Sequence, residues 1–140
     1  MKPVDQLVLH DPETDRRGDC FRTCIACLLE VDPEEVPHVV QAHCDGGEHW
    51  LHAINAWLAG RGLTYVQTTR KAARWGACWC ILSGPGPRGV DHAIVAWADW
   101  TTWNVEDIDR FHDPHPSRAG LLKIEDVGWL VPIGGPGGRP

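Results

Sequence analysis

The chain has 140 residues, a formal net charge of -6 at pH 7, and 13 Lys or Arg residues against 19 Asp or Glu residues. The length suits one domain with its own hydrophobic core. The acidic balance argues against a nucleic-acid or anionic-membrane binder, because such binding needs clustered Lys and Arg side chains to neutralise phosphates, so we expect a peptide, protein or small-molecule partner.

The chain begins with an apolar segment, residues 3–9, that we predict to be a short strand or an extended arm. A polar loop from His10 to Arg17 follows it. The next stretch, residues 18–30, carries apolar side chains at the spacing of a helix with one buried face: Phe21, Cys24, Ile25, Leu28 and Leu29. Asp19 is a favourable N-cap for this helix, and Gly18 allows a sharp turn into it.

Cys20 falls in the first turn of this predicted helix. The unpaired N–H groups and the positive end of the helix dipole favour a thiolate there, which is the state of a nucleophilic cysteine. Cys24 and Cys27 follow the apolar pattern, and we expect both to be small core residues.

Two further helices are predicted before the strands begin. Asp32-Pro33-Glu34-Glu35 starts a short helix that ends near His43-Cys44, because Asp45-Gly46-Gly47 breaks it. A third helix covers Glu48 to Ala59 and ends at Gly60 and Gly62.

Beyond Gly62 the apolar period becomes two, which predicts strands over 63–68, 77–83, 90–98, about 108–111 and 128–133. Along residues 90–98, His92, Ile94 and Ala96 should face one way and Ala93, Val95 and Trp97 the other. Helices followed by strands predict an α+β domain with an antiparallel sheet packed on the 18–30 helix. We expect one domain over residues 1–133 and a flexible Gly/Pro-rich tail over 134–140.

Three residues have the types that a thiol-dependent hydrolase needs: a thiolate, a histidine that carries its proton, and a polar group that orients the imidazole. Cys20 fits the first role. His92 lies near the start of an apolar strand, from which a rigid sheet could direct it toward a helix terminus. Asp113 follows another predicted strand and fits the third role, for which His112 and His115 are alternatives.

These residues carry a family resemblance. Gly18-Asp19-Cys20, then Asp91-His92-Ala93-Ile94-Val95, then Asp113-Pro114 resembles the papain-like cysteine peptidases, especially the branch that cleaves double-glycine leader peptides from bacteriocins. The pattern is also similar to small proteins common in bacteriophage and actinobacterial genomes. The resemblance covers residues 4–133.

The resemblance implies a papain-like fold, hydrolysis of an amide bond by a Cys20–His92–Asp113 triad, a peptide or protein substrate and no cofactor. It also implies an oxyanion site made by the Cys20 backbone N–H and an upstream glutamine. The candidate is Gln6, which lies further upstream than the family places it, so residues 10–17 would be an insertion. Phe21 stands where the leader-peptide branch has glycine, so that branch's substrate is not carried over.

Metal binding is an alternative for the cysteines. Cys20-x₃-Cys24-x₂-Cys27 has the spacing of the cluster-binding cysteines of radical SAM enzymes, but those thiols lie in an open loop of a large barrel, whereas these lie in a helical apolar pattern. A zinc site could be formed by His43, Cys44, His49 and His52, with Cys78 or Cys80. Its ligands have no recognised spacing, so we predict no metal.

The rival function is a binding module that kept the scaffold and uses a tryptophan-lined cleft to capture a partner, such as a phage-encoded modulator of a host protein. We expect the protein in the cytoplasm, because no stretch reaches the ~20 apolar residues that span a bilayer and residues 1–5 lack the apolar core of a signal peptide. In that compartment the six cysteines should be free thiols.

Overall fold

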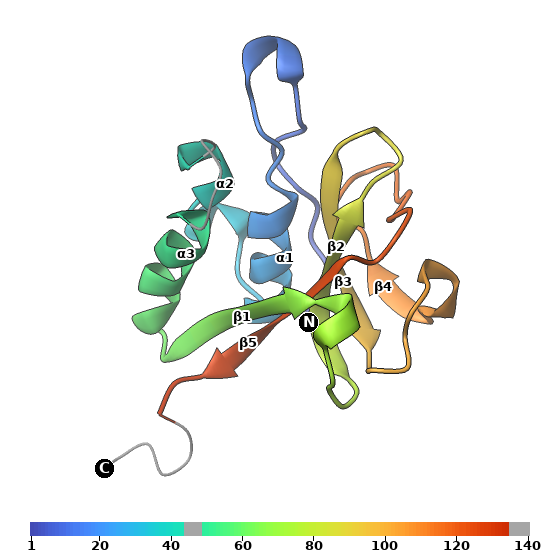
Figure 1. Ribbon diagram of the computed structural model, residues 1–140. Coiled ribbons are helices and arrows are strands. Elements are labelled where there is room, and N and C mark those ends of the chain that lie inside the picture. The colour runs from blue at the N-terminus through green and yellow to red at the C-terminus, as the bar shows by residue number, and fades with distance from the viewer. Residues whose placement is uncertain (44–48, 135–140) are drawn as a thin grey trace.

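The computed structural model describes residues 1–43 and 49–134 (Figure 1). Within these ranges the chain has three α-helices, α1 (Cys20–Leu29), α2 (Val39–Ala42) and α3 (His49–Ala59). It has five strands, β1 (Leu63–Thr69), β2 (Cys78–Pro85), β3 (Asp91–Ala98), β4 (Arg110–His112) and β5 (Asp126–Pro132). The α+β prediction is confirmed. The predicted breaker Asp45-Gly46-Gly47 and residues 135–140 of the predicted tail lie outside the described ranges.

The strands form one antiparallel sheet in the order β1-β5-β2-β3-β4. The last strand, β5, therefore lies between β1 and β2, and it pairs with β1 from Leu63↔Pro132 to Thr69↔Asp126. Packing explains why residue 128 of β5 is glycine, because a Cβ atom there would collide with the phenol ring of Tyr65. The long pairing and this close contact hold β5 in the interior of the sheet.

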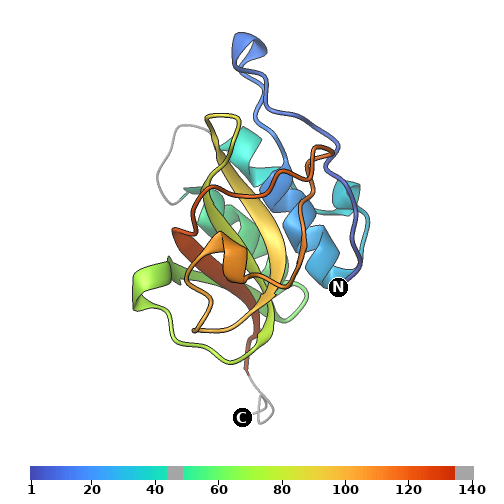
Figure 2. The same cartoon turned by 90° about the vertical axis from the view of Figure 1, so that its right-hand side faces the viewer.

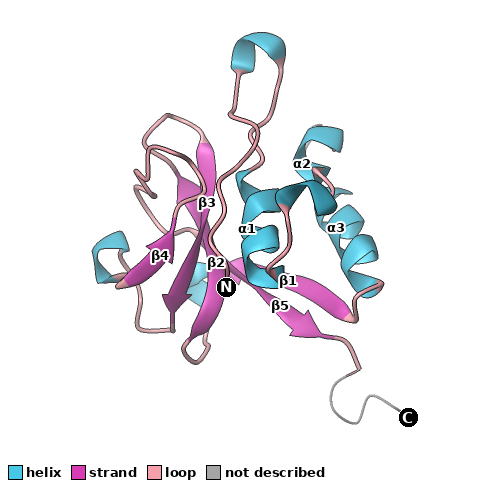
Figure 3. Cartoon of the chain, turned by 180° about the vertical axis from the view of Figure 1, so that it is seen from behind, coloured by secondary structure: helices cyan, strands magenta, loops and turns pink. Residues whose placement is uncertain are grey.

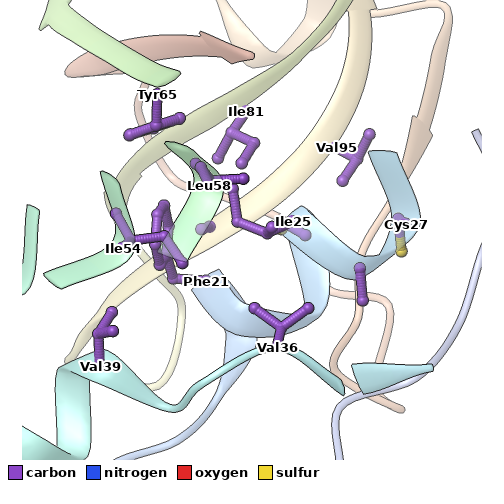
Figure 4. Close-up of a cluster of buried hydrophobic side chains, with 13 residues drawn as sticks. Phe21, Ile25, Cys27, Val36, Val39, Ile54, Leu58, Tyr65, Ile81 and Val95 are labelled. Atoms are coloured by element: carbon purple, nitrogen blue, oxygen red, sulfur yellow. The ribbon is translucent and has the colours of Figure 1, made fainter. Parts of the chain in front are cut away.

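Both faces of the sheet are covered, each by its own cluster of buried side chains. On one face the side chains of α1 and α3 meet those of the sheet, and Figure 4 shows Ile25, Leu58 and Ile81 converging there. On the other face the loops around 73, 108 and 121–124 cover Leu82, Ile94 and Val127. Strand β3 alternates as predicted, since Ala93 and Val95 belong to the first cluster and Ile94 and Ala96 to the second.

The prediction of one continuous helix from Asp32 to about residue 43 is wrong. Pro33–Glu35 form a single 3₁₀ turn, closed by the Asp32 N–H, which donates to Glu35 Oε2 at 3.0 Å. Val36 then becomes extended, with ψ of 131°, because a residue before proline avoids helical angles. The chain becomes helical again at Val39.

Residues 1–8 form an extended arm outside the sheet, which decides between the two predictions for this segment. The Lys2 N–H donates to the Cys27 carbonyl at 3.0 Å, and His112 Nε2 lies 2.6 Å from the Val4 carbonyl oxygen. In Figure 3 the arm runs from the N-terminus between α1 on one side and β3 and β4 on the other. The arm therefore joins α1 to β4, the strand that precedes Asp113.

Residues 9–17 form a hairpin lobe that projects beyond the helices and the sheet (Figures 1 and 2). Two backbone hydrogen bonds close it, from Asp11 N to Arg16 O at 2.7 Å and from Arg16 N to Asp11 O at 2.9 Å. At its base the Asp19 N–H donates to the Val8 carbonyl at 3.1 Å. The two ends of the lobe therefore lie close together. The arm stays beside α1 although the lobe separates them in the sequence.

In the described ranges we find no helix with the length and hydropathy required to cross a bilayer.

Candidate active site

The three predicted triad residues come from three elements and meet at one place. Cys20 is the first residue of α1, His92 is the second residue of β3, and Asp113 directly follows β4. His92 Nε2 lies 2.6 Å from Asp113 Oδ1, and the Cys20 side chain lies close enough to the same imidazole to raise its pKa. Because Nε2 faces Asp113, Nδ1 is the ring nitrogen left for Cys20. Cys20, His92 and Asp113 thus lie in the order expected of a nucleophile, a base and an orienting acid.

The protonation states of this group follow from its hydrogen bonds. Burial lowers the pKa of His92, but the hydrogen bond with Asp113 and the neighbouring Cys20 side chain outweigh burial and raise that pKa to about 9. Burial likewise raises the pKa of Asp113, but hydrogen bonds from His92 and from the Gly120 and His115 N–H groups lower it to about 2. At neutral pH the pair is therefore an imidazolium and a carboxylate.

Asp113, rather than either neighbouring histidine, orients His92. His112 Nε2 contacts the Val4 carbonyl, and the His115 ring centroid lies 6.3 Å from that of His92. Asp113 is 1% exposed and accepts three hydrogen bonds, from His92 Nε2 and from the backbone N–H groups of His115 (2.9 Å) and Gly120 (2.7 Å). The loop after β4 therefore holds this carboxylate rigidly behind the ring.

Asp19 is the N-cap residue of α1, as predicted, but its side chain makes no hydrogen bond to the first N–H groups of the helix. Its carboxylate instead accepts from the Val8 N–H at 2.9 Å and the Leu7 N–H at 3.3 Å, and it forms an ion pair with Arg22 at 2.8 Å. The arm lies alongside the helix start and offers two free N–H groups, which compete successfully for the carboxylate. Asp19, 1% exposed, thereby fixes the arm beside Cys20.

This contact brings Gln6 to the cavity that Cys20 also lines. A Cβ atom on Gly18 would lie 3.3 Å from Gln6 Nε2 and 3.1 Å from the His10 backbone nitrogen, so the glycine is needed for close approach of the arm. Gln6 Nε2 donates one N–H to the Val8 carbonyl at 2.7 Å, which leaves its second N–H for a ligand. The distance along the chain between Gln6 and Cys20 is taken up by the hairpin lobe.

A cavity of about 750 Å³ opens over these residues. Gln6, Cys20 and His92 line it, while Asp113 stays behind the imidazole. Of the eight tryptophans, Trp50 is the one that lines this cavity. This cavity therefore carries a single tryptophan. The remaining lining residues are Leu9, His10, Pro12, Arg17, Gly18, Phe21, Val40, Arg88, Val90, Asp91 and His115.

The cysteines outside the site behave as core or structural thiols. Cys24 and Cys27 are 0% exposed and pack between α1 and the sheet, as predicted. The five cysteines in the described ranges are free thiols. Those ranges contain no cluster of three His, Cys, Asp or Glu side chains that could hold a metal ion. The zinc candidate also includes Cys44, which lies outside the described residues.

Three features of the site were not anticipated from the sequence: the Asp19 clamp on the arm, the Gly120 N–H on Asp113, and the two arginines of the cavity, Arg17 and Arg88. Gly120 has a φ of 73°, and the glycine itself is the one local signal of that turn. The other contacts join residues far apart in the chain, and no local pattern indicates them.

Comparisons with family models, with curated proteins and with solved structures give no match to this chain.

Proposed function

We propose that this chain is a cysteine-dependent hydrolase of papain-like fold that cleaves an amide bond in a peptide or protein, in the cytoplasm and without a cofactor. The observation that supports this most is the buried 2.6 Å contact between His92 and Asp113, with Cys20, the first residue of α1, beside His92 in the wall of one cavity. The order along the chain, nucleophile then histidine then acid, and the helix packed on an antiparallel sheet support the papain-like assignment.

In the first half-reaction the Cys20 thiolate attacks the carbonyl carbon of the scissile amide and forms a C–S bond. The His92 imidazolium gives its proton to the amide nitrogen, the C–N bond breaks, and the amine leaves. Asp113 keeps the imidazole oriented throughout and stabilises its charged form. A thioester on Cys20 and a neutral His92 remain.

In the second half-reaction neutral His92 removes a proton from water, and the resulting hydroxide attacks the thioester carbonyl. The C–S bond breaks, the carboxylic acid product leaves, and the thiolate–imidazolium pair is restored. In both halves the carbonyl oxygen becomes negative. The Cys20 backbone N–H, one of the unpaired donors of the helix start, and the free N–H of Gln6 are placed to stabilise that charge.

The test is turnover of an internally quenched peptide library by wild-type protein, Cys20→Ala and the matched control Cys78→Ala, which removes a half-buried thiol away from the cavity. We expect cleavage by the wild type and by Cys78→Ala, and none by Cys20→Ala. The activated ester p-nitrophenyl acetate gives a second readout, because it should leave an acetyl group on Cys20 that intact-mass spectrometry detects. Cleavage that survives in Cys20→Ala, or no acylation of Cys20, would refute the hydrolase.

A further inference from the structure

We infer that the cleft selects a peptide that carries a carboxylate close to the scissile amide, and that Arg17 and Arg88 bind this carboxylate. The inference rests on the proposed function for the position of the scissile bond, but the binding of the carboxylate itself can be measured without turnover.

Arg17 lies on the helix side of the cavity, three residues before Cys20. Its backbone is held at both ends: its N–H donates to Gln41 Oε1 at 2.6 Å, and its carbonyl lies 3.0 Å from His38 Nε2. The residue is half-buried, so its side chain starts from a fixed position at the foot of the hairpin lobe. The backbone of Arg17 is thus fixed beside the cavity, from which its side chain can reach a ligand near Cys20.

Arg88 lies on the sheet side of the same cavity, in the loop between β2 and β3 that leads into His92. Its Nη1 donates to Ser117 Oγ at 3.0 Å, from the loop that also holds Asp113. Each wall of the cavity thus carries one guanidinium, and each is a few residues from a member of the Cys20–His92 pair. A ligand seated over that pair lies between the two walls.

The two arginines of the cavity have no side-chain ion-pair partner within the described residues. There the arginines that form ion pairs with side chains are Arg22 and Arg118, neither of which lines the cavity. Asp91 is the exposed carboxylate among the lining residues, and the charge of His92 is matched by Asp113 and by the proposed Cys20 thiolate. Burial and the nearby Arg88 lower the pKa of His115, so that ring adds no positive charge at neutral pH.

This charge pattern favours an anionic group of the substrate over a neutral one. A guanidinium binds a carboxylate through two parallel N–H···O bonds, whereas an amide offers one neutral oxygen. The carboxylate could belong to an Asp or Glu side chain or to a free C-terminus. The chemistry is the same in the three cases, and the experiment separates them.

The experiment uses one peptide library in matched versions, with Glu and Asp or with Gln and Asn at each position, and with a C-terminal acid or amide. Turnover is measured with the wild type, and binding is measured with Cys20→Ala by fluorescence anisotropy. We expect the acidic versions to be preferred about ten-fold to a hundred-fold, the range for a hydrogen bond to a charged group. If turnover depends on Glu or Asp against Gln or Asn, the bound carboxylate is a side chain of the substrate. If turnover depends on a C-terminal acid against an amide, the bound carboxylate is the substrate's C-terminus.

Arg17→Gln and Arg88→Gln should each reduce the preference for acid. Arg16→Gln is the matched control, because Arg16 is an exposed neighbour in the same lobe that does not line the cavity, and it should retain the preference. Equal use of acidic and neutral peptides, or equal effects of Arg16→Gln and Arg17→Gln, would overturn the inference while leaving the hydrolase intact. Acid-selective binding to Cys20→Ala without any turnover by the wild type would support the carboxylate site and refute the hydrolase.

Discussion

His92 Nε2 and Asp113 Oδ1 lie 2.6 Å apart, and the two residues are 5% and 1% exposed. They are 21 positions apart in the chain, and the pairing of β3 with β4 brings them together. Since water is excluded from this contact, the carboxylate acts strongly on the ring and holds His92 in its charged form.

The first prediction concerns Asp113→Asn. The amide can still accept from the imidazole but carries no charge, so the pKa of His92 should fall from about 9 toward its ordinary value. Because protonated His92 must supply the leaving-group proton, the alkaline limb of kcat/KM should move to lower pH. A pH–rate profile measures this shift. Asp109→Asn, which changes an exposed carboxylate just before β4, should leave the limb in place, and an unshifted limb in Asp113→Asn would contradict the role.

The same contact should make stability depend on pH. The pKa of His92 is raised, so its contribution is complete below pH 6.5 and is lost as pH rises through about 9. The pKa of Asp113 is depressed, so its contribution is complete above pH 3.8 and is lost as pH falls through about 2. The Tm of the wild type should therefore exceed that of Asp113→Asn most near pH 5 and least near pH 10. A Tm difference that is the same at both pH values would argue against a charged pair.

Cys20 should be alkylated by iodoacetamide at pH 6 faster than the other cysteines of the described chain, because thiolates are the reactive form. Burial raises the pKa of Cys24, Cys27 and Cys78, and raises that of Cys80 to about 12. Time-resolved peptide mapping after labelling measures each rate. Cys20→Ser should lose the fast phase entirely, and a fast phase assigned to any other cysteine would reject Cys20 as the nucleophile.

Asp19 should act on catalysis through Gln6. Gln6→Ala removes a donor to the developing oxyanion and should lower kcat by about a hundred-fold with little change in KM. Asp19→Asn weakens the hold on the Leu7 and Val8 N–H groups, so it should also lower kcat by displacing Gln6.

A double-mutant cycle separates this coupling from a general loss of structure. If Asp19 works by positioning Gln6, adding Asp19→Asn to Gln6→Ala should lower kcat little further. The activity is measured with p-nitrophenyl acetate. Additive losses in kcat would show that Asp19 acts independently of the arm.

Ile25→Ala tests the packing of α1 on the sheet. Ile25 is 0% exposed, so its truncation should lower the free energy of unfolding by about 2–5 kcal/mol through lost burial and the cavity left behind. Urea denaturation measures the change. Leu122→Ala, at a residue that is 67% exposed, is the control and should change it by less than about 0.5 kcal/mol. Equal effects at the two positions would contradict this packing.

Much of the secondary structure was predictable because it follows local patterns. The apolar spacing around Ile25 predicted α1, and the period of two around Ile94 predicted β3, since both depend on which neighbouring side chains share a face. Pro37 is a local signal too, because it keeps Val36 extended and so separates the turn at Pro33–Glu35 from α2, whereas the favourable helix start at Asp32 predicts one helix.

By itself, then, the sequence determined the helix that carries Cys20, the strand that carries His92 and the α+β order of the elements. The tertiary structure alone decided that β5 enters the sheet between β1 and β2, that the Asp19 side chain binds the N–H groups of the arm and not those of α1, and that Arg17 and Arg88 line one cavity. The physical reason is the separation along the chain of the residues that interact. A periodic pattern states which face of an element is buried, but a hydrogen bond or a strand pair between distant residues depends on which other groups the folded chain brings within reach.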